Sequence, residues 1–105
     1  MSTPKQLHGV PFQGTTTHAT AAVATITAVT GKAHFITDIA ASSDKAGAIV
    51  VVKQGTTVIW QIQLAANDRL DHSFVTPLEG AIGALVSIEV DGTSACKVNI
   101  AGFTL

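Results

Sequence analysis

The chain has 105 residues, of which 12% are Asp, Glu, Lys or Arg, compared with roughly 25% in an average soluble domain. Six basic and seven acidic residues lie singly along it and give a formal net charge of −1, which argues against a nucleic-acid-binding face. The single cysteine, Cys96, excludes an intrachain disulfide and a thiolate metal cluster. This length fits one domain that can bury a core of its own.

The beginning of the chain is expected to be an N-terminal arm over residues 1–14, ahead of a single domain over 15–105. Three apolar residues in this arm, Leu7, Val10 and Phe12, favour burial against the domain or against a neighbour. No basic-then-apolar signal pattern is present, and no apolar stretch is long enough to cross a membrane. We therefore expect synthesis in the cytoplasm and no membrane partner.

The first half of the domain is predicted to begin with two strands. Residues 15–29 are rich in Thr, Ala and Val and lack a 3.6-residue apolar stripe, so they favour one strand over a helix. Gly31 and Lys32 then turn the chain, and residues 33–42 form the next strand. A polar loop follows over 42–47.

A hairpin is the clearest local prediction, with strands over 48–53 and 56–65 joined by a two-residue turn at Gln54-Gly55. In that register Val51 pairs with Val58, and Ile49 pairs with Trp60. The core face would then carry Ile49, Val51, Val58, Trp60, Ile62 and Leu64. The opposite face would carry Ala48, Val50, Val52 and Ile59, which we interpret as contacts with another subunit.

The second half is predicted to contain a polar loop over 66–71 and three further strands. The first covers 72–76 and ends at Pro77. The second, over 82–90, alternates with Ile82, Ala84, Val86, Ile88 and Val90 inward. The third, over 94–104, has Cys96, Val98 and Ile100 inward. We expect these last two strands to pair, and because their inward residues must match, we predict an odd-length loop or a bulge at 91–95.

These segments predict an all-β fold, an antiparallel β-sandwich of about eight strands with an extended N-terminal arm. Eight strands would fit a jelly roll, although the strand order cannot be derived from one sequence.

The sequence contains no recognisable catalytic or metal-binding motif. The histidines at 8, 18, 34 and 72 are interpreted as isolated surface residues, because a metal site needs several converging ligands. No nucleophile elbow or phosphate-binding glycine loop is present. We therefore expect a protein that is not an enzyme, with no metal and no cofactor.

Several segments resemble the small β-sandwich head decoration (cement) proteins of tailed bacteriophages. They are GTTVIWQIQLAAN (55–67), HSFVTPLEGAIGALVSIEV (72–90) and CKVNIAGFTL (96–105), within a similarity that covers residues 15–105. The resemblance implies a jelly-roll-like virion protein on the capsid exterior. It would form dimers or trimers, bind the major capsid protein and strengthen the shell.

The low charge and the apolar outer face of the predicted hairpin agree with such a structural role. The candidate interface residues are Leu7, Val10, Phe12, Ala48, Val50, Val52 and Ile59. The alternative is a receptor- or glycan-binding module of a phage tail or fibre.

Overall fold

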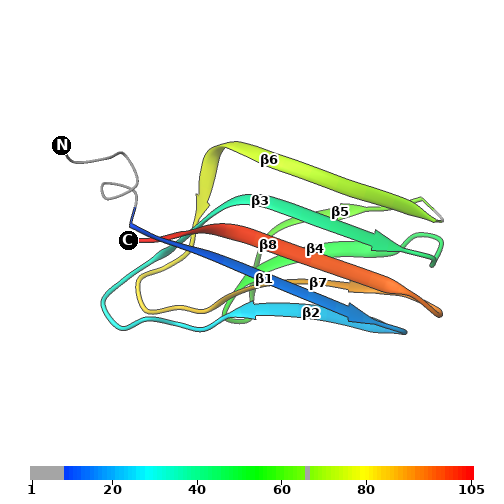
Figure 1. The fold of residues 1–105 in the computed structure, drawn as a ribbon, viewed down its shortest axis with the longest axis horizontal. Helices are drawn as coiled ribbons and strands as arrows, with labels where there is room; N and C mark the ends of the chain where they lie inside the picture. The colour runs from blue at the N-terminus through cyan, green and yellow to red at the C-terminus, as the bar shows by residue number, and fades with distance from the viewer. Residues whose placement is uncertain (1–8, 66) are drawn as a thin grey trace.

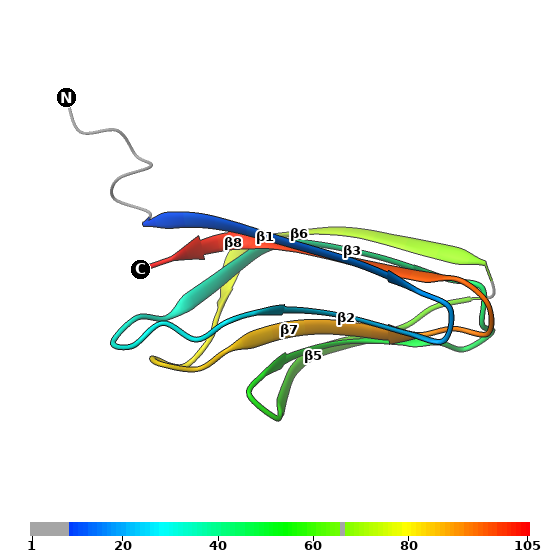
Figure 2. The same cartoon turned by 60° about the horizontal axis from the view of Figure 1, so that its bottom comes forward.

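The computed structural model describes residues 9–65 and 67–105, which form eight β-strands in two packed layers (Figure 1). Figure 2 shows the layers from the side, with β1, β8, β3 and β6 above β2, β7 and β5. The strands are β1 (Val10–His18), β2 (Ala21–Ile26), β3 (His34–Ser43), β4 (Ile49–Gln54), β5 (Thr57–Gln63), β6 (Asp68–Glu79), β7 (Val86–Asp91) and β8 (Cys96–Thr104).

The strand pairing is nested. β1 pairs with β8, β2 with β7, β3 with β6 and β4 with β5, all antiparallel. This pattern results when one long hairpin, with its tip between β4 and β5, is wound into a sandwich. The first sheet has the order β1-β8-β3-β6 and the second sheet the order β2-β7-β4-β5. The fold is a jelly roll, and the expected all-β antiparallel sandwich of eight strands is confirmed.

The core lies between the two sheets and is built by alternating residues. Inward Val86, Ile88 and Val90 of β7 were predicted and are buried. Val98 and Ile100 of β8 were also predicted inward and are buried. The full buried cluster is Ala22, Ala24, Ile36, Ile39, Ala41, Ala48, Val50, Val52, Leu64, Val86, Ile88, Val90, Cys96, Val98 and Ile100.

A bulge in β3 lets two isoleucines three positions apart both face the core. Ile36 pairs with Gly102 and Asp38 pairs with Ala101, so Thr37 is an extra residue that shifts the inward phase. Ile36 and Ile39 are consequently both buried.

β6 bends sharply opposite the same bulge (Figure 1). Leu78 pairs with Ile36 and Ser73 pairs with Asp38, so residues 74–77 of β6 face a single residue of β3. β6 is an edge strand, where Pro77 costs no ladder hydrogen bond. The prediction that a strand ends at Pro77 is therefore wrong, because the strand continues through the bend.

The β4–β5 hairpin has a different register from the predicted one. Gln54 pairs with Thr57, which places the two-residue turn at Gly55-Thr56. Gly55 has φ 55°, as the first position of a primed hairpin turn requires. A register shift on the β5 side then brings Val52 opposite Trp60. The predicted pairs Val51–Val58 and Ile49–Trp60 are absent from this hairpin.

Other boundaries also differ from expectation. Residues 10–14, assigned to the arm, form the first half of β1. The single strand expected over 15–29 is two strands in different sheets, because the chain turns after His18. The His18 ring Nδ1 accepts the backbone N–H groups of Thr20 and Ala21 at 3.0 and 3.1 Å and so stabilises that turn.

The last two strands do not pair with each other, since β7 and β8 belong to opposite sheets. The prediction of an odd-length loop or a bulge at 91–95 is therefore wrong, because it assumed that these strands pair, and residues 92–95 form an even-length connection between them. Ile82 also lies outside β7, which begins at Val86. The polar loop predicted over 66–71 is shorter than expected, because β6 begins at Asp68.

His34 is a structural residue and not the surface histidine that the sequence suggested. Its side chain is buried, and its ring Nε2 lies 2.8 Å from the carbonyl oxygen of Thr27. Nε2 must therefore donate, and Nδ1 accepts from the Thr104 hydroxyl at 2.7 Å. His34 thus ties the loop after β2 to the end of β8.

Candidate functional site

Three of the predicted interface residues belong to the core. Ala48, Val50 and Val52 are all at most 1% exposed, and they face the opposite sheet. The expectation that they contact another subunit is wrong, because no surface remains on them for a partner. The outward residues of β4 are Ile49, Val51 and Lys53.

The remaining interface candidates have different environments. Val10 is 68% exposed at the start of β1. Phe12 and Ile59 are partly buried and pack against the core. Leu7 lies outside the described residues.

One end of the sandwich carries a group of exposed apolar side chains, which we call the apolar end. The loop over 27–33, the loop over 80–85, the first described residues and the C-terminus all lie there (Figure 1). Ile82 is 74% exposed, although the sequence predicted it inward. The exposed apolar residues of this end are Val10, Val29, Ile82, Leu85 and Leu105.

Backbone hydrogen bonds hold the apolar end together. The N–H of Gly83 donates to the Lys32 carbonyl at 2.8 Å and joins the two loops. Ala33 and Leu105 exchange N–H···O bonds of 3.0 Å in both directions. The N–H of Gly55 donates to the Leu85 carbonyl at 2.9 Å. The loops that carry the exposed apolar side chains are therefore held in place by backbone hydrogen bonds.

The opposite end is polar and rich in charge. Asp44 accepts the N–H groups of Thr93 and Ser94, each at 2.9 Å, and also accepts the Ser94 hydroxyl. These bonds to the charged form hold the pKa of Asp44 far below its usual value. Lys45 forms an ion pair with Asp91, which lowers the pKa of that carboxyl, mainly through the hydrogen bond from Lys45.

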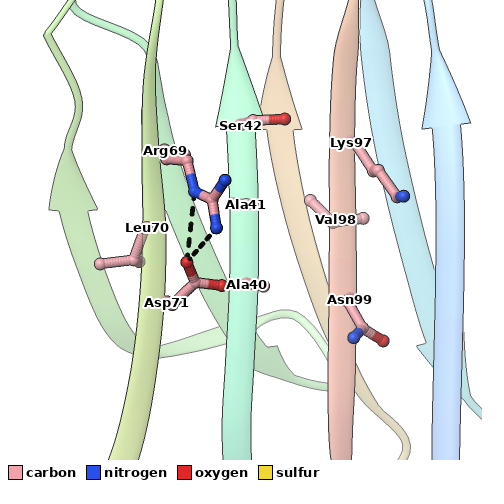
Figure 3. Close-up of a pocket in the computed structure, with 9 residues that line it drawn as sticks. All are labelled: Ala40, Ala41, Ser42, Arg69, Leu70, Asp71, Lys97, Val98 and Asn99. Carbon is pink, nitrogen blue, oxygen red and sulfur yellow. Dashed lines mark hydrogen bonds and ion pairs between the residues drawn. The ribbon is translucent and has the colours of Figure 1, made fainter.

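A groove lies on the outer face of the first sheet, towards the polar end (Figure 3). Its cavity measures about 280 Å³. Arg69 and Asp71 form one wall and Lys97 the other, with small side chains of β3 between them. Arg69 binds Asp71 through Nε at 3.3 Å and Nη2 at 3.0 Å. The lining residues are Ala40, Ala41, Ser42, Arg69, Leu70, Asp71, Lys97, Val98 and Asn99.

Three aromatic rings meet where the edge strands β5 and β6 approach each other. The Trp60 ring stacks on the His72 ring with centroids 5.4 Å apart. The Phe74 ring meets Trp60 at 5.6 Å and His72 at 4.6 Å, edge to face in both cases. Trp60 and Phe74 also pack against the core, so these rings close the edge of the sandwich.

Residues 9–65 and 67–105 contain no group of three or more His, Cys, Asp or Glu side chains arranged to hold a metal ion. Within these same ranges, no helix has the length and apolar character needed to span a membrane.

Comparisons with known proteins add no family. No protein-family model matches the chain, and no curated protein matches its sequence significantly. Among solved structures, dimeric latent PorU from Porphyromonas gingivalis is similar at a TM-score of 0.34 and 12% sequence identity. The match covers 90% of this chain but only 10% of that one. A likeness this weak carries no argument about function.

Sequence reasoning missed both the apolar end and the groove. A signal for the apolar end was present, since Val29 and Ile82 lie beside the turn glycines Gly31 and Gly83, where apolar side chains are easily left exposed. The groove depends on cross-strand register between distant segments, and the sequence carries no local signal for that.

Proposed function

We propose that this protein is a virion structural protein, a decoration or cement protein that binds the major capsid protein on the outer surface of the shell. The apolar end is the observation that carries the proposal. A braced apolar surface at one end, with the Asp44 loop and the Lys45–Asp91 ion pair at the other, suits a protein that binds a partner through its apolar end. The resemblance of residues 15–105 to phage decoration proteins supports the same function.

The size of the apolar end also bears on how binding would work. Complete burial of one large apolar side chain contributes roughly 1.5–3 kcal/mol, and these side chains are already partly covered. Association itself costs on the order of 4–15 kcal/mol. A single copy would therefore bind weakly, and linkage of copies into an oligomer that contacts several sites of the lattice at once would provide the strength.

We further propose that copies associate as a dimer or trimer through the outer face of the second sheet. Val23, Ile49 and Val58 are exposed there, each between 43% and 46%. The Lys53–Glu89 ion pair, at 2.5 Å, lies on the same face and neutralises its central charges. The proposed interface thus lies on the outer face of the second sheet and no longer includes Ala48, Val50 and Val52, which are buried.

A sedimentation assay tests the capsid proposal. Shells of the same virus, assembled without this protein, are mixed with the purified wild type and two variants. Ile82→Glu places a charge on the apolar end and is expected to weaken binding by about tenfold or more, because the carboxylate would be buried without a partner. Thr17→Glu adds the same charge on the outer face of the first sheet, near the end of β1, and is expected to bind like the wild type. Failure of the wild type to bind would overturn the proposal.

A further inference from the structure

We propose that the groove on the first sheet binds a sugar that carries a carboxylate, such as a uronic or sialic acid. The groove lies towards the polar end and shares no residue with the apolar end. The inference therefore goes beyond the proposed function and can be tested on the free protein.

The register of three strands sets the groove. Ser42 of β3 pairs with Arg69 of β6 on one side and with Lys97 of β8 on the other. Neighbouring strands lie about 4.8 Å apart, so the backbones of Arg69 and Lys97 are separated by roughly 10 Å. The short Ser42 side chain leaves the space between the two cations open. In Figure 3 the Arg69 guanidinium group extends towards β3, whereas the Lys97 ammonium group points away from β3, towards β1. An anionic group in this space lies beside Arg69, and the exposed Lys97 side chain reaches it after a change of rotamer.

The neighbouring cross-strand row, formed by Asp71, Ala40 and Asn99, has polar groups that can bind the hydroxyls of a sugar. Ala40 of β3 lies between Asp71 and Asn99, and its small methyl group leaves room for a ligand above the sheet. The Asn99 Oδ1 accepts from the Thr15 hydroxyl at 2.9 Å, which leaves the Asn99 amide NH₂ to donate. In Figure 3 the nitrogen of this amide is on the side of β3. Asp71 supplies an acceptor on the opposite wall.

The positive charges of Arg69 and Lys97, together with the negative charge of Asp71, favour a ligand that has one carboxylate and several hydroxyl groups. Arg69 and Lys97 can each make a charge-assisted hydrogen bond to a carboxylate. Asp71 would repel a phosphate dianion more strongly than a single negative charge, yet it can accept a hydroxyl of a sugar. The scattered charge of the chain argues against a polyanion that needs a continuous basic track.

The dimensions fit a small ligand with room to extend. A volume of about 280 Å³ is slightly below the range of typical ligand pockets, about 300–1,000 Å³, and suits a single sugar ring. A second, more open cavity of about 310 Å³ continues towards the polar end and shares Ser42, Arg69 and Lys97. The geometry thus accommodates one acidic ring at the cations and a neighbouring unit beyond it.

A titration followed by amide NMR tests this inference. Sodium glucuronate and N-acetylneuraminic acid are the probes, and glucose and sodium acetate are the matched controls for the ring and for the anion. We expect saturable shifts at Ser42, Arg69 and Lys97 with at least one acidic sugar, and much weaker shifts with either control. Shifts that are equal for acetate and the acidic sugars, or absent with both sugars, would overturn the inference.

Variants separate a real site from general charge attraction. Lys97→Gln and Arg69→Gln are each expected to weaken binding by about tenfold, because each removes a charge-assisted hydrogen bond. Lys32→Gln removes one positive charge outside the groove and is expected to leave affinity unchanged. An equal loss in all three variants would reject the groove as the site. Wild-type-like spectra of the unbound variants confirm that the fold is kept.

Discussion

Val52 of β4 lies directly opposite Trp60 of β5, and Val52 is fully buried. This pairing decides which side of the hairpin faces the core. Residues in phase with Val52, such as Val50, point inward, and their neighbours Ile49 and Val51 point outward.

Opposite consequences are therefore expected for two adjacent residues. Val50→Glu buries a carboxylate without a partner and is expected to prevent folding, since stabilities of small domains are only about 5–15 kcal/mol. Ile49→Glu, at a position 46% exposed, is expected to fold with a free energy of unfolding close to that of the wild type. Circular dichroism and urea denaturation compare the two, and a folded Val50→Glu would refute the assignment of faces.

Oligomerisation provides a separate prediction for Ile49→Glu. If the outer face of the second sheet joins copies, this variant is expected to lower the solution mass of the wild-type oligomer to that of a monomer. Light scattering coupled to size exclusion measures it. Thr17→Glu, on the outer face of the first sheet, is the control that should retain the mass. A wild type that is monomeric at all concentrations would contradict the proposed interface.

Gly102 is expected to be intolerant of any side chain. A Cβ at this position would lie 1.9 Å from the carbonyl oxygen of Phe35 and 2.8 Å from the Phe12 ring. Gly102→Ala should therefore reduce the free energy of unfolding by about 1–3 kcal/mol or more, as overpacking does. Gly14→Ala is the control, because its Cβ would meet only side-chain atoms, the nearest at 3.2 Å. Equal stability of the two variants in urea would contradict this account.

Acid stability is expected to depend on Asp44. Its pKa is lowered in the folded state by the bonds from Ser94 and Thr93, so the charged form favours folding. That contribution is complete above the unfolded-state pKa of about 3.9 and is lost as the pH falls below it, towards the lower folded-state pKa. Asp44→Asn should be less stable at pH 7, and its stability should fall less between pH 5 and pH 2. A parallel loss in both proteins would exclude this role.

His34 is expected to contribute through both ring nitrogens. His34→Leu would leave the carbonyl of Thr27 and the hydroxyl of Thr104 without their partner, and an unsatisfied buried group costs about 1–3 kcal/mol. Thermal unfolding measures the loss. Amide hydrogen exchange should also accelerate in the 27–33 loop, and unchanged exchange there would show that His34 does not brace the apolar end.

The sequence predicts the β7 and β8 faces well, because polar Glu89 and Lys97 interrupt the apolar residues and mark the outward phase. It predicts β4 badly, because the run AIVVV is apolar in both phases. Lys53 could have decided between the two faces, because it lies on the same face of β4 as Ile49 and Val51. In the structure it extends to Glu89 on the solvent side. Placing Ile49 and Val51 inward would have buried that charge.

Two irregularities escape sequence reasoning for a physical reason. The extra residue at Thr37 and the bend at 74–77 change the phase within a strand, and a strict two-residue alternation cannot represent them. The groove is harder still to foresee, since Arg69, Ser42 and Lys97 meet only through the register of three strands. The groove therefore depends on the order and the register of these three strands, and no single segment of the sequence predicts it.

The most direct test of the proposed function is a cryo-electron microscopy reconstruction of shells assembled without the protein and then incubated with it. We predict added density on the outer surface, with the 27–33 and 80–85 loops against the shell and the 92–95 loop facing solvent. Absence of added density, or a bound copy whose apolar end faces solvent, would contradict the account.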